Sequence, residues 1–415
     1  MPSFALVLVF VAVAFLSWGV WGPTLHQGQH DLGAFLEPSG LRAFLCVGIA
    51  YFAIAVVVPL VLLFTRGEKG RWTIGGVVWS VAAGAAGAVG ALGIILAFKS
   101  RGSPVYVMPL VFGLAPVVNT FVTMFMNRSL KEAGPIFYMG VAIVAIGAAG
   151  VLTFQPKAKD VEVIETDDGA ITVHLTEVGA EGGKKTTTWQ AASLEELAAD
   201  AKAYKLYEKE MSAPTFWQMT LFIPLSILLT AVCWGSYGPV LHKGQSGMKG
   251  SRLRPFLCVG LAYFVVAVVA PLMLTPVLVE AGGWNVSGTL WSLASGSAGA
   301  VGALGIIMAF NFGGKPIYVM PLVFGCAPVV NTFVTVTAEG TYRQVQAPFF
   351  FSLGLVILGA VTVLVFAPRG KGHGPNADSH ADDKAAPDDN RYDDKRTDDS
   401  RENDADENQP TEKDG

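Results

Sequence analysis

Polar side chains stand inside two almost identical apolar stretches of the chain. Residues 104–123 read PVYVMPLVFGLAPVVNTFVT, and residues 316–335 read PIYVMPLVFGCAPVVNTFVT. Each stretch carries an Asn-Thr pair, Asn119-Thr120 or Asn331-Thr332. An amide and a hydroxyl together offer donors and acceptors that could bind a neutral solute bearing hydroxyl or amide groups. The same groups also join neighbouring membrane helices by hydrogen bonds, so both interpretations stay open.

Prolines add a second unusual feature to these stretches. A proline inside a helix removes a backbone donor and leaves a carbonyl about one turn earlier without its partner. In lipid such a carbonyl needs another partner, so an interruption is tolerated where it faces protein or a wet cavity. We therefore expect both segments to be interrupted helices, with four hinge residues: Pro109, Pro116, Pro321 and Pro328.

A second repeated motif, WGxxGPxLHxGQ, occurs at residues 17–29 and 233–245. Its Gly-Pro pair predicts a helix break, with the following histidine and glutamine on unwound backbone. Histidine titrates close to neutrality, so these residues are candidates for gates and proton coupling, although each could simply bond a loop carbonyl: His26, Gln29, His242 and Gln245. The aromatic residues of the motif are either functional or part of an interfacial belt: Trp18, Trp21, Trp234 and Tyr237.

A third repeat is rich in small residues. Residues 79–93 read WSVAAGAAGAVGALG, and residues 291–305 read WSLASGSAGAVGALG. Small residues let helix backbones approach closely, which predicts a tightly packed interface. A sliding seam during a conformational change is the alternative.

These motifs belong to apolar runs of about 20 residues, the length that crosses a bilayer. The ten runs lie near residues 3–22, 42–64, 75–98, 104–126, 135–154, 216–238, 254–276, 286–310, 316–335 and 348–367. The second five match the first five at an offset of 212 residues, except that the first span matches at 216. The chain is therefore an internal duplication.

The charges of the loops predict that the two halves are inverted. The loop after the first span has one basic residue, Arg42, whereas its copy has four: Lys243, Lys249, Arg252 and Arg254. The loop after the second span has Arg66, Lys69 and Arg71, and its copy has none. Because basic residues favour the cytoplasmic side, the bias places both termini in the cytoplasm of an inner-membrane protein.

These features predict an all-α polytopic membrane protein with ten transmembrane helices in two inverted five-helix repeats, residues 1–154 and 216–367. Residues 155–215 form an external linker, with a possible β-hairpin around TDDG and a capping box at Ser193–Glu196 before a helix to about Met211. The linker is either a small folded cap or a polar tether. Residues 368–415 form an acidic tail that we expect to be disordered.

Composition and missing motifs exclude several classes of function. The chain is 52% hydrophobic and 15% charged, and its carboxylates fall in the linker, in the tail, or between and at the ends of spans. The four cysteines lie within apolar runs, which disfavours disulfides and zinc sites. No hydrolase or nucleotide-binding motif occurs. We expect no enzyme activity, cofactor, metal or nucleic-acid partner.

The ten spans, the Gly/Ala-rich third span and the Pro-containing fourth span resemble the drug/metabolite transporter superfamily, and its sugar- and ureide-permease branches most closely. In that family, helices 1, 3 and 4 of each half are thought to line a central cavity. The resemblance implies substrate-binding roles for the residues at those places, which join the two Asn-Thr pairs: Trp18, Trp79, Ser80, Tyr106, Trp234, Trp291, Ser292 and Tyr318.

The sequence thus predicts a secondary transporter working by alternating access on a small neutral polar solute such as a sugar, nucleoside or ureide. Aromatic faces, amides and hydroxyls suit such a solute, and no buried charge balances an ion. Besides solute and membrane lipid, no partner is implied, and the protein is a monomer or a homodimer. Alternatives are an exporter of metabolites or drugs with the same fold and a non-transporting membrane sensor or scaffold.

Overall fold

The computed structural model describes residues 2–34, 37–126, 128–154, 160–166, 170–178, 184–211, 214–274, 277–314, 316–339 and 345–366. In these segments, eight helices are long and apolar enough to cross a membrane, and two shorter apolar helices span Leu322–Ala338 and Ala347–Val363. The protein is therefore helical and has the architecture of a multi-pass membrane protein. The acidic tail lies outside the described residues.

The helices before the linker are α1 (Pro2–Leu32), α2 (Gly40–Phe52), α3 (Val58–Thr65), α4 (Ile74–Lys99), α5 (Pro104–Met126) and α6 (Pro135–Thr153). A π-helical turn, η1 (Ala53–Val57), joins α2 to α3, and η2 (Leu130–Glu132) is a 3₁₀ turn. After the linker come η3 (Gln218–Phe222), α9 (Ile223–Gly247), α10 (Leu253–Phe264), η4 (Val265–Val269), α11 (Ala270–Leu274), α12 (Val286–Asn311), α13 (Pro316–Glu339) and α14 (Ala347–Val365).

The predicted helix breaks do not occur. Helix α1 runs through Pro23 and α9 through Pro239, so the histidines and glutamines of the repeated motif lie on helix. Helix α5 likewise contains Pro109 and Pro116 without interruption. A proline removes one backbone hydrogen bond, but the other backbone groups of an apolar segment have no partners outside the helix. The helix therefore continues.

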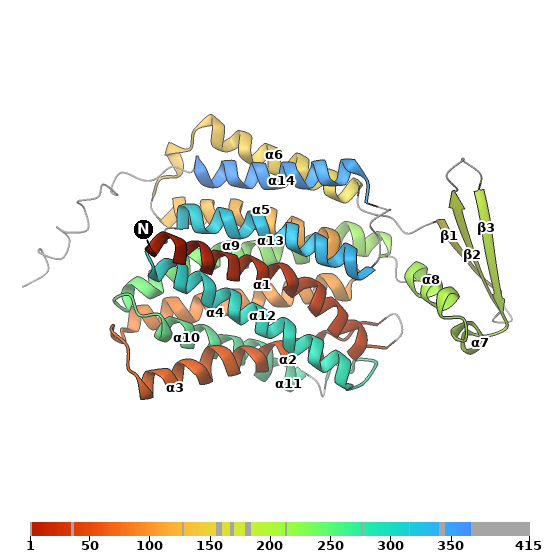
Figure 1. The fold of residues 1–415 in the computed structure, drawn as a ribbon, viewed down its shortest axis with the longest axis horizontal. Helices are drawn as coiled ribbons and strands as arrows, with labels where there is room; N and C mark the ends of the chain where they lie inside the picture. The colour runs from red at the N-terminus through yellow and green to blue at the C-terminus, as the bar shows by residue number, and fades with distance from the viewer. Residues whose placement is uncertain are drawn as a thin grey trace, which may run out of the picture. The chain divides into compact units, whose positions relative to one another are not determined.

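Helices from the two halves pair with one another. Helix α1 packs along α12, and α9 packs along α4; α6 and α14 also lie side by side (Figure 1). Glycines make the close approaches possible. A methyl group at Gly84 would lie 2.6 Å from the Cα atom of Val259, and one at Gly296 would lie 2.6 Å from the Cα atom of Val47. The small residues of α4 and α12 are thus packing surfaces, as expected.

The linker contains a small folded unit with a core of its own. Strands β1 (Asp160–Glu165), β2 (Ile171–Val178) and β3 (Lys184–Ala191) form an antiparallel sheet in the order β1-β2-β3. Helices α7 (Leu194–Ala198) and α8 (Ala201–Met211) follow. The hairpin and the Ser193 cap are confirmed, because β1 pairs with β2 and the Glu196 amide donates to Ser193 Oγ. The Glu196 carboxylate accepts the amide of Ala192, one residue before the position that a capping box requires. The core contains Ile171, Val173, Ala191, Leu197, Ala203 and Tyr207.

Candidate functional site

A small aromatic cavity lies among α1, α2, α4, α9, α10 and α12. Its volume is about 30 Å³, which is enough for one or two water molecules. Eight residues line it: Trp18, Trp21, Tyr51, Gly87, Trp234, Tyr237, Tyr263 and Gly299. At the offsets of the internal duplication, these residues form four equivalent pairs, and only the pair of Trp21 and Tyr237 differs in residue type. Each half therefore contributes the same positions to one cavity.

Glycines on α4 and α12 hold two of the three tryptophans of the cavity, Trp18 and Trp234. The indole N–H of Trp18 donates to the Gly299 carbonyl at 3.3 Å, and that of Trp234 donates to the Gly87 carbonyl at 3.1 Å. A side chain at Gly302 or Gly90 would collide with these rings. The bare backbone of each glycine-rich helix is thus the surface on which an indole from the other half lies.

Two tyrosines stack at the same cavity. The rings of Tyr51 and Tyr263 lie with centroids 3.7 Å apart and planes 1° from parallel. The Trp18 and Trp234 rings are 6.2 Å apart, and Trp21 meets Trp234 edge-on at 5.5 Å. These contacts between aromatic rings narrow the cavity.

The cavity is uncharged but keeps a polar group. None of its eight lining residues is ionised at neutral pH. The Tyr237 hydroxyl is buried and has no hydrogen-bond partner among the described residues. A buried hydroxyl without a partner costs free energy that a bound polar group would recover. The lining therefore suits a neutral ligand with at least one polar group.

Of the site residues predicted on α1, α4, α9 and α12, only some line the cavity. Trp18 and Trp234 line the cavity, whereas Trp79 and Trp291 do not. The ammonium group of Lys243 lies 4.0 Å from the centre of the Trp79 ring, and Trp291 is 43% exposed. The hydroxyls of Ser80 and Ser292 are buried without partners among the described residues and lie against Gly244 and Gly28.

The Asn-Thr pairs of α5 and α13 are buried beside α9 and α1 rather than at the cavity. The Asn331 amide donates to the Pro104 carbonyl at 2.9 Å, which joins α13 to the start of α5. Asn119 lies against Gly238. The Thr120 hydroxyl donates to the Pro116 carbonyl of its own helix, whereas that of Thr332 is buried without a partner among the described residues. The hydrogen bond of Asn331 therefore matches the second interpretation of the Asn-Thr pairs, in which they join neighbouring helices.

The tyrosines and prolines predicted as site or hinge residues of α5 and α13 also lie away from the cavity. Tyr106 is buried, and so are Pro109 and Pro116, whereas the side chains of Tyr318 and Pro321 lie outside the described part of the structure. Pro328 is buried in α13. None of these residues lines the cavity.

The histidines and glutamines of the repeated motif lie near the ends of α1 and α9. His26 packs edge-on against Phe98 at 5.1 Å, and His242 meets Phe310 in the same way at 6.0 Å. The Gln29 side chain donates to the Ile95 carbonyl at 3.3 Å. Gln29 and Gln245 each keep a buried side-chain oxygen with no partner among the described residues. These residues contact α4 or α12 and do not reach the aromatic cavity.

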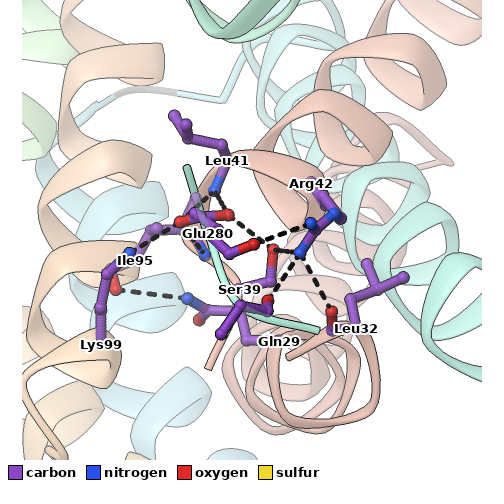
Figure 2. A network of polar contacts seen from close by, with 10 residues as sticks. Gln29, Leu32, Ser39, Leu41, Arg42, Ile95, Lys99 and Glu280 are labelled. Carbon is purple, nitrogen blue, oxygen red and sulfur yellow. Dashed lines mark hydrogen bonds and ion pairs between the residues drawn. The ribbon is translucent and has the colours of Figure 1, made fainter. Parts of the chain in front are cut away.

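A carboxylate joins the two halves at the start of α2 (Figure 2). The Glu280 carboxylate accepts hydrogen bonds from the Ser39 hydroxyl and from the amides of Gly40 and Leu41. Lys99 Nζ lies 2.7 Å from the same carboxylate, and Arg42 donates to the Glu280 and Ala281 carbonyls. We call this group of contacts the Glu280 latch. The Glu280 carboxylate thus caps the start of α2 and forms a salt bridge at the same time.

An equivalent latch closes the start of α10. The Glu68 carboxylate accepts hydrogen bonds from the Ser251 hydroxyl and from the amides of Arg252 and Leu253. Arg254 lies 3.6 Å away and donates to the Glu68 and Lys69 carbonyls. We call this the Glu68 latch. Burial alone would raise the pKa of Glu68 and of Glu280, but the donated hydrogen bonds outweigh it and hold both pKa values below the ordinary value of 4.5.

The sequence interpretation missed Tyr51 and Tyr263 as lining residues. Each lies in an otherwise apolar second or seventh span, where one tyrosine carries little signal. The available signal was the offset of 212, which places the two tyrosines at equivalent positions. The sequence places the carboxylates of the latches in loops, and it does not show which helix start a loop carboxylate meets.

Comparison with known proteins adds little to this site. No family model matches the chain, and no curated protein matches it. A solved structure described only as "Crystal structure of protein" covers 87% of this chain and 97% of its own, with 18% sequence identity and a TM-score of 0.45. A likeness of this degree carries no conclusion about fold or function.

Proposed function

We propose that the protein is a secondary transporter that works by alternating access on a small neutral polar solute. One observation carries this proposal: an aromatic cavity to which two duplicated halves contribute equivalent residues. Transporters built from inverted repeats bind their solute between the repeats. The resemblance to the drug/metabolite transporter superfamily agrees with this proposal, as does the absence of any ionised side chain from the cavity lining.

Reciprocal contacts support the inverted arrangement of residues 1–154 and 216–367. The indole of Trp18 bonds to α12, and the indole of Trp234 bonds to α4. Likewise, Glu280 of the second half caps α2 of the first, and Glu68 of the first half caps α10 of the second. An exchange of this kind is expected where two like halves are related by a twofold axis in the membrane plane.

The two latches are the proposed gates of the transporter. Inversion would place the Glu280 latch at one membrane face and the Glu68 latch at the other, with the aromatic cavity between them. With both latches formed and room in the cavity for only one or two water molecules, the conformation would be a solute-free state between the two open ones. Opening one latch at a time would expose the cavity to one side only, as alternating access requires. The loop charges favour cytoplasmic termini and an inner-membrane location.

The neutral character of the solute follows from the electrostatics of a membrane interior. An ion moved into a low-dielectric cavity without a counter-charge loses several kcal/mol. Indole and phenol faces instead favour the apolar face of a sugar, nucleoside or ureide, while the free Tyr237 hydroxyl offers a hydrogen bond. Export of amphipathic metabolites would use the same cavity.

Uptake into proteoliposomes tests this function. Radiolabelled sugars, nucleosides and ureides are offered to the reconstituted protein, and we expect uptake of one class above that of empty vesicles. Tyr237→Phe removes the unpartnered hydroxyl, so it should lower the apparent affinity about tenfold while leaving the melting temperature unchanged or higher. The matched control is Tyr138→Phe, at a side chain that is 55% exposed.

Three outcomes would count against the proposal. Uptake of no class would favour a sensor or scaffold, and uptake of amphipathic compounds alone would favour the exporter. Uptake with the same apparent affinity by Tyr237→Phe and the parent protein would show that the solute does not bind in the aromatic cavity.

A further inference from the structure

An open hollow lies beside the Glu68 latch and is rich in basic side chains. Its volume is about 700 Å³, and it is lined by Arg66, Gly67, Glu68, Lys69, Gly250, Arg252 and Asn311. The single carboxylate of this lining is already engaged by Ser251 and Arg252. Arg66 and Lys69 are exposed. The hollow therefore presents an excess of positive charge.

The equivalent turn of the second half lacks these basic residues. At the offset of 212, Glu68 corresponds to Glu280, Gly70 to Gly282 and Trp72 to Trp284, and both glycines have positive φ angles. Arg66, Lys69 and Arg71 correspond to Leu278, Ala281 and Gly283, and Arg252 corresponds to Gly40. The Glu280 latch thus forms without counterparts of these four basic residues, and its ion pair comes from Lys99, which corresponds to Asn311.

An apolar groove adjoins the basic hollow. It has a volume of about 290 Å³ and is lined by Trp72, Thr73, Ile74, Val77 and Val78. Trp72, Ile74 and Val78 are more than half exposed. Arg254 connects the two places, because it donates to the Lys69 carbonyl and lies 5.8 Å from the centre of the Trp72 ring. A charged hollow at the end of a helix therefore continues into a groove suited to hydrocarbon.

We propose that this hollow and groove bind one anionic phospholipid, with its phosphate at Arg66, Lys69 and Arg252 and an acyl chain along Trp72, Ile74 and Val78. Basic pockets at the ends of membrane helices hold anionic headgroups by charge, and each basic residue near the surface adds to the attraction. The groove distinguishes a lipid from a free anion. The site goes beyond the proposed transport function and does not depend on it.

The position of the site gives the lipid an effect on the Glu68 latch. A phosphate at Arg252 would compete with Glu68 for the same guanidinium group. The equivalent turn of the second half lacks these basic residues, so a bound lipid would act on one latch and leave the Glu280 latch unchanged.

The test measures the melting temperature of the purified protein in detergent with added phosphatidylglycerol, phosphatidylcholine or inorganic phosphate. Phosphatidylglycerol should raise the melting temperature of the parent protein, and the increase should shrink as salt is added. The double variant Arg66→Gln with Lys69→Gln should bind phosphatidylglycerol about thirtyfold more weakly. The matched control, Arg128→Gln with Lys131→Gln, removes the same charge from another loop and should behave as the parent.

Each other result would overturn the proposal. Equal stabilisation by phosphatidylcholine would show that charge plays no part, and equal stabilisation by inorganic phosphate would identify a free-anion site. If phosphatidylglycerol stabilised the Arg66→Gln with Lys69→Gln variant as much as the parent, the lipid would not bind in this hollow. No stabilisation of the parent would show that no such site exists. These results are read without any transport assay, so they are separate from the test of transport.

Discussion

The buried polar side chains of this protein act mainly across the two halves. Indole groups bond to glycine carbonyls, an asparagine bonds to a proline carbonyl, and carboxylates cap helix starts. Residue types in the sequence identified Trp18, Trp234, Asn119 and Asn331 as candidates, but could not show which of them share a cavity. Burial and partners depend on helix rotation, which the near-continuous apolar character of the spans leaves unspecified.

The latch carboxylates predict a pH dependence of stability. Their folded pKa values lie below 4.5, so their stabilisation is fully present above pH 4.5 and is lost as pH falls through the folded pKa. Glu280→Gln should therefore cost about 1.5 to 3 kcal/mol at pH 7, because it weakens hydrogen bonds to a charged group. At a pH below the folded pKa of Glu280, the variant and the parent should unfold alike.

Thermal unfolding of the parent, Glu280→Gln and Glu132→Gln at several pH values measures this effect. Glu132 is exposed, so its variant serves as the control for the loss of one carboxylate and should match the parent. A difference between Glu280→Gln and the parent that persists at the lowest pH would contradict the role of the ionised carboxylate.

At the scale of helices, the glycines of α4 and α12 determine how closely the halves meet. A methyl group at Gly296 would meet backbone atoms of Val47, which cannot move aside as a flexible side chain would. Gly296→Ala should therefore destabilise the protein by about 1 to 3 kcal/mol. Gly354→Ala is the control, because a methyl group there has nothing within 4 Å and alanine favours a helix.

The melting temperatures of these two variants check the prediction. Gly296→Ala should melt well below the parent, whereas Gly354→Ala should melt at the same temperature or slightly higher. Equal melting temperatures would show that α2 and α12 do not rely on this close approach.

Helices were easier to predict from the sequence than their ends and their partners. The predicted apolar runs coincide with the eight helices long enough to cross a membrane and with the two shorter apolar helices, but α1 continues to Leu32, well beyond the expected end near residue 22. The break at Gly22-Pro23 was wrong because one lost hydrogen bond does not end a helix whose other groups lack partners. Strand β3 was missed because KKTTTWQ has no large apolar residue before Trp189. The single helix expected up to about Met211 is divided into α7 and α8, because Asp200 accepts the amides of Lys202 and Ala203 and so begins a new helix.

At the scale of the whole molecule, internal duplication links the fold to the proposed mechanism. Four equivalent residue pairs line one cavity, and two equivalent latches close the starts of α2 and α10. The duplication itself could be read from the constant offset of the sequence. The meeting of both halves at one cavity could not, because an offset along the chain says nothing about distance in space.

Two native cysteines report directly on alternating access. Cys46 lies on α2 between the Glu280 latch and Tyr51, and Cys258 lies on α10 between the Glu68 latch and Tyr263; both are buried. The decisive measurement is the rate at which a membrane-impermeant thiol reagent labels protein that retains only one of these cysteines, in Glu280→Gln and Glu68→Gln backgrounds. Glu280→Gln should speed labelling of Cys46 about tenfold and leave Cys258 unchanged, and Glu68→Gln should do the reverse. Faster labelling of both cysteines in both backgrounds, or of neither, would contradict alternating access through two separate gates.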